Sequence, residues 1–287
     1  LKVVQPHWQA GMLDVIYEEG EIFVSYTEDR GDDKTSTSIA RGFIENDSFS
    51  KIENIFQSGS SWNNIHWRSR LMLKDGLLYA SIGERRYGSV AQDPTSYFGK
   101  MIRINKDGTA PKDNPYSMNE EWLPEIYQIG LRNPQGIMLY PNDSEIYITN
   151  HGPRGGDFFG KVEAGTNYGW ADVAWGGIDY DGSIIGDGSA WKEGLLKPIY
   201  TWVPSIAVSD MTFYGGDLYP ELKNKILVTS LKAQRLISLE FDGKKARNET
   251  TLFEKVGRVR DVETNSAGEI YVIIDNEDSG IWKLVNK

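Results

Sequence analysis

Two of the three histidines lie where a base could act on a bound small molecule. His66 lies in NNIHWRSRL, just before an expected strand, and His151 opens HGPRGGD, just after another. Imidazole is the side chain whose ordinary pKa suits proton transfer near neutrality. A single histidine is more often packed or at the surface, as we expect for His7. Two at equivalent loop positions leave a functional role and a packing role equally open.

The segment HGPRGGD, residues 151–157, is a glycine-rich turn that ends in an aspartate. No helix is expected after it, so it does not match a dinucleotide- or phosphate-binding loop. Glycine allows backbone angles that expose carbonyl oxygens, and Ca²⁺ prefers carbonyl and carboxylate ligands. The alternative is an ordinary tight connection with a surface aspartate, and the turn taken alone favours that alternative.

Four cations stand out in a chain whose net charge is −10. Arg132 lies in LRNPQG, Lys232 in SLKAQ, and Arg258 and Arg260 in GRVRD, each near the edge of an expected inner strand. Arg258 and Arg260 are two residues apart, so on an extended strand they point to the same side. Converging cations would bind a polyanionic small molecule, because arginine matches carboxylates. The alternative is solvated cations paired with the abundant acids.

The loops that hold these residues are expected to join short strands. The chain has 30 glycines and 11 prolines, and short apolar runs recur between turn signals without long helical periodicity. A strand–turn–strand phrase recurs as LMLKDGLLYASIG, IMLYPNDSEIYITNHG and DVETNSAGEIYVIID. A four-stranded unit that repeats at about 50 residues predicts an all-β fold, a β-propeller. A β-sandwich or jelly roll with unequal strands is the alternative.

The predicted strands fall into five groups, and the last group has three strands. A long loop rich in Gly, Asp and Trp, residues 170–197, is expected over the central channel. The strands are expected at residues 12–17, 21–26, 38–44 and 52–57; 70–73, 77–82, 100–104 and 125–129; 136–139, 145–149, a poorly defined stretch around 167–173, and 199–202; 210–214, 225–229, 236–241 and 250–254; and 259–264, 269–274 and 281–284.

Composition excludes several classes of protein. The chain has 287 residues, 41 acidic and 31 basic side chains, and no cysteine. An acidic balance argues against a nucleic-acid partner, which needs a basic face. No apolar run reaches the roughly 18 residues of a membrane helix, so no membrane span is expected. The absence of cysteine excludes disulfides, thiolate zinc sites and a thiol nucleophile.

The sequence resembles the soluble PQQ-dependent aldose sugar dehydrogenases of the glucose/sorbosone dehydrogenase superfamily. RNPQG, HGPRGGD, NYGW and R-x-RD are specific when they occur together, and the likeness runs from about residue 11 to the end. The matching phrases, in the family's order, are GMLDVIY, IHWRSRL, LYASIGE, AQDPTSYFGKMIRINKDGTAPKDNPY, PEIYQIGLRNPQGI, NHGPRGGD, GTNYGW, YTWVPSIA, TSLKAQRLISLEFDG and GRVRDVE.

The resemblance implies a six-bladed propeller that carries pyrroloquinoline quinone (PQQ) on a Ca²⁺ ion and oxidises the C1 hydroxyl of aldoses to lactones. His66 would be the general base that takes the hydroxyl proton while the hydride moves to the quinone. Gly152 and Pro153 would offer backbone carbonyls to the Ca²⁺, and Asp157 would support His66 or the substrate. The cofactor would be bound or bordered by Arg132, Asn133, His151, Ser205, Lys232, Arg258 and Arg260.

The resemblance also implies partners and a location. The partners would be an aldose sugar and a soluble electron acceptor, and the protein would be periplasmic or secreted. The oligomeric state is left open. Two other functions remain as alternatives: a non-catalytic propeller binding module, and a calcium-dependent hydrolase of the lactonase type. The retained base and cations favour the dehydrogenase, and we find no cage of carboxylates and Asn that a lactonase would need.

The sequence departs from the family at three places around these residues. Phe-Phe-Gly at residues 158–160 replaces Glu-Leu-Asn, which removes a carboxylate expected in a second, structural calcium site. Trp67 and Arg68 follow His66 where the family commonly has small residues, and GERR at 83–86 replaces Gly-Asp-Arg-Gly. We expect this bulk and charge to narrow the sugar pocket or change its preference.

A further departure concerns length. The family has a further blade before the GMLDV phrase, preceded by an export signal, whereas about ten residues stand there in this chain. We therefore expect residues 1–287 to form a single propeller domain that is N-terminally incomplete. The prediction is about five recognisable blades, with a gap or a strained closure in place of the first.

Overall fold

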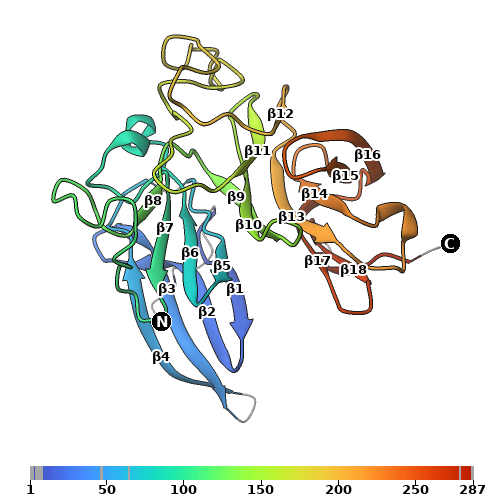
Figure 1. The fold of residues 1–287 in the computed structure, drawn as a ribbon, viewed down its shortest axis with the longest axis horizontal. Helices are drawn as coiled ribbons and strands as arrows, with labels where there is room; N and C mark the ends of the chain where they lie inside the picture. Colours follow the sequence, from blue (N-terminus) through green and yellow to red (C-terminus); the bar gives the residue numbers. More distant parts are fainter. Residues whose placement is uncertain (1–2, 4–8, 46–47, 64, 278, 286–287) are drawn as a thin grey trace. The chain divides into compact units, whose positions relative to one another are not determined.

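Strands dominate the structure, a computed structural model that describes residue 3 and residues 9–45, 48–63, 65–277 and 279–285. Within these residues the strands form five sheets, and the strands of each sheet lie in chain order from one edge to the other (Figure 1). The chain divides into two compact units. The first unit comprises Leu1–Pro134, Glu163–Asp172 and Lys192–Leu196, and the second comprises Gln135–Val162, Val173–Trp191 and Lys197–Lys287.

The first unit holds two four-stranded sheets and the 3₁₀ helix η1. Apolar side chains alternate along the strands, so that one face of each sheet turns inward. Phe23, Ile39, Leu78 and Ile102 pack in one buried cluster between the two sheets. The elements are β1 (Met12–Glu18), β2 (Glu21–Asp29), β3 (Thr35–Glu45), β4 (Ser48–Gln57), β5 (Leu71–Lys74), β6 (Leu77–Ile82), η1 (Gly88–Gln92), β7 (Lys100–Asn105) and β8 (Ile126–Gln128).

The second unit holds the other three sheets and the 3₁₀ helix η2. The last sheet has three strands, as the sequence predicts. The elements are β9 (Pro134–Tyr140), β10 (Glu145–Asn150), β11 (Asp157–Lys161), β12 (Tyr200–Trp202), β13 (Val208–Tyr214), η2 (Pro220–Leu222), β14 (Lys225–Ser230), β15 (Arg235–Phe241), β16 (Ala246–Glu254), β17 (Arg258–Thr264), β18 (Ile270–Asp275) and β19 (Gly280–Lys283).

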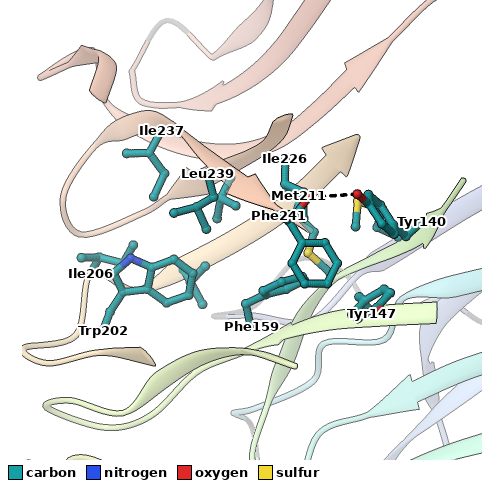
Figure 2. Close-up of a cluster of buried hydrophobic side chains, with 13 residues drawn as sticks. Tyr140, Tyr147, Phe159, Trp202, Ile206, Met211, Ile226, Ile237, Leu239 and Phe241 are labelled. Carbon is teal, nitrogen blue, oxygen red and sulfur yellow. Dashed lines mark hydrogen bonds between the residues drawn. The ribbon is translucent and has the colours of Figure 1, made fainter. Parts of the chain in front are cut away.

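An aromatic cluster joins the first two sheets of the second unit (Figure 2). The ring centroids of Tyr140 and Tyr147 lie 4.9 and 5.1 Å from that of Phe241. The Tyr140 hydroxyl donates to the Phe241 carbonyl at 3.0 Å, so the buried phenol keeps a polar partner. Each large apolar side chain buried here contributes about 1.5–3 kcal/mol, which fixes the two sheets against each other.

The third strand of the third sheet differs from the prediction. The sequence analysis expects a strand around residues 167–173, but the strand that pairs between β10 and β12 is β11, Asp157–Lys161. Phe158 and Phe159 are 6% and 0% exposed, and the Phe159 ring packs on Phe241 at 5.1 Å. The glycine-rich turn therefore leads directly into a strand, because two adjacent aromatic residues can both be buried when a strand is covered on both faces.

The five sheets match the predicted five blades, and no regular sixth sheet occurs among the residues that the structure describes. The other predicted strands coincide with observed ones to within a few residues. The single domain and the expected gap or strained closure stay predictions. Among the described residues, no helix is long and apolar enough to cross a membrane.

Candidate functional site

His66 lies in the loop between β4 and β5 of the first unit, with a left-handed backbone conformation (φ +56°). For a residue other than glycine this conformation costs about 1–3 kcal/mol, so neighbouring groups must hold it. The backbone N–H of His66 donates to Gln9 Oε1 at 2.9 Å. The residue is 6% exposed. Its imidazole is thus nearly buried on a constrained backbone.

Glu84 orients this imidazole. Its Oε1 lies 2.7 Å from His66 Nδ1, and the residue is 1% exposed. The other carboxylate oxygen accepts from the backbone N–H of Gly88 at 3.0 Å, and the Glu84 N–H donates to the Arg132 carbonyl at 2.9 Å. A carboxylate beside Nδ1 favours the tautomer that carries its proton there. Nε2 is then the nitrogen that can accept a proton.

The surroundings of His66 keep it neutral. Burial lowers the pKa of the imidazole, Glu84 raises it, and the positive charges of Arg132 and Arg86 lower it again, so that the pKa lies below its ordinary value of 6.5. A neutral imidazole with an oriented Nδ1–H is a competent general base. The sequence analysis did not identify Glu84 as its partner. The available signal was its position directly after an inner strand, which is the position of His151 in the other unit.

Arg132 and Asn133 follow β8 in the same unit and are 2% and 3% exposed. The guanidinium carbon of Arg132 lies 5.3 Å from the centroid of the Trp170 ring, within the range of a cation–π interaction. Two predicted cofactor residues and the predicted base therefore belong to one unit. Arg132 is linked to the base through the backbone of Glu84 and through its charge.

The bulky residues that depart from the family, Trp67, Arg68 and Arg86, belong to the first unit, as does Arg85, which matches the family. Trp67 is 1% exposed and Arg85 is 0% exposed, and the Arg85 guanidinium lies 3.7 Å from the centroid of the Trp67 ring. The expectation that these departures narrow the sugar pocket or change its preference stays a prediction, and of the GERR segment only Arg86 is exposed.

In the second unit, Asp157 braces the glycine-rich turn. Its carboxylate accepts from the backbone N–H groups of Gly152 at 2.9 Å and Val208 at 3.0 Å. The hydroxyl of Ser205 lies 2.9 and 2.8 Å from its two oxygens, and Asp157 is 0% exposed. These contacts tie the turn to the segment before β13. The predicted role of Asp157 toward His66 or the substrate stays a prediction, as does the place of Ser205 beside the cofactor.

The turn between β10 and β11 is too tight for side chains at several glycines. A Cβ atom on Gly152 would lie 2.1 Å from the Gly155 carbonyl oxygen, and Gly156 has φ +80°. Gly152 and Pro153 are buried, and His151 at the start of the turn is partly buried. The backbone carbonyls of this turn are held rigidly, which is the donor chemistry that Ca²⁺ accepts. A metal site here stays a prediction.

The three other predicted cations also lie in the second unit. Arg258 and Arg260, on β17, both approach Asp275 Oδ2: Arg258 Nε at 3.7 Å and Arg260 Nε at 2.9 Å. They therefore share one side of the strand, as their spacing predicts. Burial and the neighbouring Arg260 lower the pKa of Arg258. Lys232 is exposed in the turn after β14. Both guanidinium groups therefore share the carboxylate of Asp275.

Three carboxylates gather at β13 and β17, which the sequence analysis did not foresee. Single oxygens of Asp210, Asp261 and Glu263 lie within 4.8 Å of one another. Asp210 Oδ2 accepts from the backbone N–H of Val262 at 3.4 Å, so it also links the two strands. The grouping arises from the packing of two sheets, and spacing along the chain gives no sign of it.

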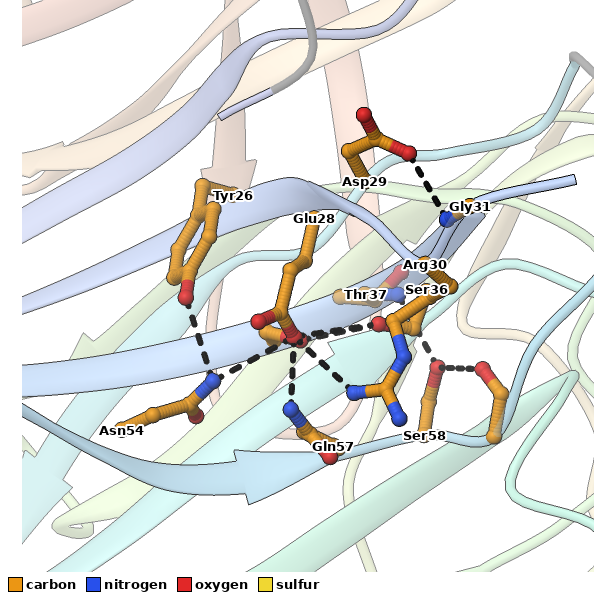
Figure 3. Close-up of polar contacts among 12 residues, drawn as sticks. Tyr26, Glu28, Asp29, Arg30, Gly31, Ser36, Thr37, Asn54, Gln57 and Ser58 are labelled. Atoms are coloured by element: carbon orange, nitrogen blue, oxygen red, sulfur yellow. Dashed lines mark hydrogen bonds and ion pairs between the residues drawn. The ribbon is translucent and has the colours of Figure 1, made fainter. Parts of the chain in front are cut away.

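A hollow of about 770 Å³, lined in part by Glu28, opens beside the first sheet. Burial raises the pKa of Glu28, but hydrogen bonds from Ser38, Gln57 and Arg30 outweigh burial and hold the pKa below its ordinary value. Figure 3 shows Arg30 and Gln57 among the side chains that converge on the Glu28 carboxylate. The donors to Glu28 Oε2 are Arg30, Ser36, Ser38, Asn54 and Gln57.

Comparison with known proteins decides the family. Residues 1–283 match the glucose/sorbosone dehydrogenase family. The chain belongs to this family. It is 32% identical to the aldose sugar dehydrogenase YliI of Escherichia coli (strain K12), over 98% of this chain and 78% of that protein.

Solved structures of the family confirm the fold. A crystal structure of glucose dehydrogenase aligns with a TM-score of 0.91 at 28% identity, and covers 99% of this chain and 85% of that chain. The PQQ-bound aldose sugar dehydrogenase of Streptomyces coelicolor aligns with a TM-score of 0.75 at 19% identity, over 98% of this chain and 81% of that chain, and shows the shared fold alone. Family and fold together identify a sugar dehydrogenase of the aldose or glucose type and an all-β propeller with five recognisable blades.

Proposed function

We propose that this glucose/sorbosone dehydrogenase family member oxidises the C1 hydroxyl of an aldose to the lactone, with PQQ as hydride acceptor and a soluble protein or dye as the next electron acceptor. The observation that carries the proposal is the buried pair of His66 and Glu84, joined at 2.7 Å. A neutral imidazole oriented by a carboxylate is what proton removal from a sugar hydroxyl requires.

The residues present fit the chemistry of PQQ, which carries three carboxylates. Arg258 and Arg260, which both contact the carboxylate of Asp275, would pair with the cofactor's carboxylates, because a guanidinium group matches a carboxylate. Arg132, Asn133 and Lys232 would hold the cofactor's other oxygens, and His151 and Ser205 would border it. When bound, PQQ supplies a two-electron acceptor, which no side chain of the protein provides. A Ca²⁺ on the carbonyls of Gly152 and Pro153 would supply Lewis-acid polarisation.

The protein's part in the reaction is proton transfer. His66 Nε2 would take the proton of the C1 hydroxyl as the C1–H bond breaks and its electron pair leaves with the hydride. The imidazolium that forms carries its positive charge beside Glu84, whose carboxylate stabilises it. Because both residues are nearly buried, this interaction is stronger than the same pair would be in water.

Reconstitution tests the proposal. The protein is incubated with PQQ and Ca²⁺, a panel of aldoses is added, and reduction of a dye is followed together with quinone absorbance on the washed protein. His66→Ala should keep the bound quinone and lose turnover. Bound quinone without dye reduction in the wild type would favour the binding module. No bound quinone at all would show that the cofactor assignment is wrong.

A further inference from the structure

The peptide group of His66 is enclosed by the segment that follows β6. A Cβ atom on Gly83 would lie 2.1 Å from the His66 carbonyl oxygen and 2.9 Å from its carbonyl carbon. Only glycine leaves room for that carbonyl. The next residue, Glu84, binds the imidazole. Two consecutive residues of one loop therefore contact the backbone and the ring of the same histidine, and the third residue of the loop is Arg85.

Arg85 completes the enclosure. Its Nη1 donates to the His66 carbonyl oxygen at 3.1 Å, and its Nη2 donates to the hydroxyl of Thr37. The guanidinium also stacks on the ring of Trp67 at 3.7 Å, and the centroid of the Phe98 ring lies 5.5 Å away. Arg85 is 0% exposed. Its planar group is thus fixed from three directions, and one of its contacts is the backbone of the predicted base.

Burying a charged guanidinium group costs free energy, which burying an apolar side chain would not. Burial disfavours its charge and lowers its pKa, and Glu84 is the main group that opposes this. An apolar side chain of similar volume would pack against Trp67 and Phe98 without that cost. It would not supply a donor to the His66 carbonyl. The left-handed conformation of His66 persists only if its surroundings determine it, and Arg85 meets that need.

We propose that Arg85 is a positioning residue for His66: its buried guanidinium, anchored on Thr37 and Trp67, holds the His66 backbone in the conformation that brings the imidazole to Glu84. The catalytic consequence rests on the proposed function, in which His66 is the base. The positional claim rests on the contacts alone. Arg85 donates to a backbone carbonyl, so it acts through His66 and not on the substrate.

The first experiment measures the histidine ring without cofactor. The chain has three histidines, so ¹⁵N-histidine NMR of the apoprotein gives signals from only three imidazole rings. In the wild type, His66 should show a protonated Nδ1 whose proton exchanges slowly. Arg85→Met should shift that signal and speed the exchange at least about tenfold. Thr37→Val removes one anchor but keeps Arg85, and should produce a smaller change in the same direction.

The control is Lys112→Met, at an exposed cation of the same unit that is not among the charges acting on His66. It should leave the proton exchange of His66 Nδ1 unchanged within twofold. Arg85→Lys keeps the positive charge but loses the planar guanidinium group that contacts both His66 and Thr37. It should fold even if Arg85→Met does not, and it should still disturb the His66 signal. An unchanged His66 signal in Arg85→Lys and Thr37→Val would overturn the proposal.

The second experiment separates positioning from folding in the reconstituted enzyme. A base displaced by about 1 Å costs roughly 100-fold in rate, so Arg85→Lys should lower kcat by about 10- to 100-fold. The KM for sugar and the quinone bound per protein should stay within twofold. If the wild type itself shows no turnover, the proposed function fails, and the NMR comparison still decides the positional claim. If Arg85→Lys disturbs the His66 NMR signal but keeps the wild-type kcat, the claim that Arg85 supports catalysis through His66 is wrong.

Discussion

Replacement of Glu84 by Gln tests how the protein makes His66 a base. The substitution keeps the size of the side chain and removes its negative charge. Glu84 Oε1 lies 2.7 Å from His66 Nδ1, and the two residues are 1% and 6% exposed. The variant therefore changes mainly the charge that faces the imidazole, and the loss of activity should measure the value of that charge.

The magnitude follows from the geometry. Opposite charges about 4 Å apart attract by about 4 kcal/mol at an effective dielectric constant of about 20. Hydrogen bonds to charged groups contribute about 1.5–3 kcal/mol net in measured cases. The measured range is the better guide, because the Coulomb figure leaves out desolvation. At about 1.36 kcal/mol for each factor of ten, kcat/KM should fall by roughly 10- to 100-fold.

The pH profile should move in a defined direction. Burial and the charges of Arg132 and Arg86 lower the pKa of His66, while Glu84 raises it. Without the carboxylate the pKa falls further, so the acidic limb of kcat/KM should shift to lower pH while the plateau drops. The assay is dye reduction across pH after reconstitution with PQQ and Ca²⁺, with Glu121→Gln, an exposed acid of the same unit, as control.

Two results would refute this reasoning. A plateau and an acidic limb equal to those of the wild type would show that Glu84 does not act on the reacting imidazole. An acidic limb that moves to higher pH would show that Glu84 does not raise the pKa of His66 as the structure indicates. Quinone absorbance on the variant, equal to that of the wild type, excludes loss of cofactor as the cause.

Two further predictions concern stability. Asp157→Asn places an amide NH₂ against hydrogen-bond donors that now donate to the carboxylate. It should lower the free energy of unfolding, measured in urea, by about 1–3 kcal/mol. Glu221→Gln, at an exposed acid, should leave the free energy of unfolding unchanged. Glu28 has a lowered pKa, so its charge stabilises the fold above its unfolded pKa of about 4.3 and less as the pH falls through the folded value. Glu28→Gln should therefore destabilise the protein at pH 7, with the difference from wild type shrinking below pH 4; a constant difference would count against the argument.

The sequence specifies the strands wherever apolar residues alternate between turn signals. The segments around Leu77–Ile82 and Glu145–Asn150 are examples, because each has a short polar turn before an apolar run that has to be buried. It also specifies the residue types of the site, since RNPQG and HGPRGGD are local motifs. β11 escaped prediction because its burial depends on Phe241, which lies about 80 residues further along the chain.

What the sequence determined by itself is the class of fold and the family resemblance, because these depend on local pattern, and the resemblance made His66 the candidate base. Only the tertiary structure decided how His66 is held. Glu84 and Arg85 lie 18 and 19 residues beyond it, and their contacts depend on the loop after β6 folding back beneath the loop before β5. Side-chain charge is visible in a sequence, but burial and partners are not, and those two properties set the pKa of the imidazole and its orientation.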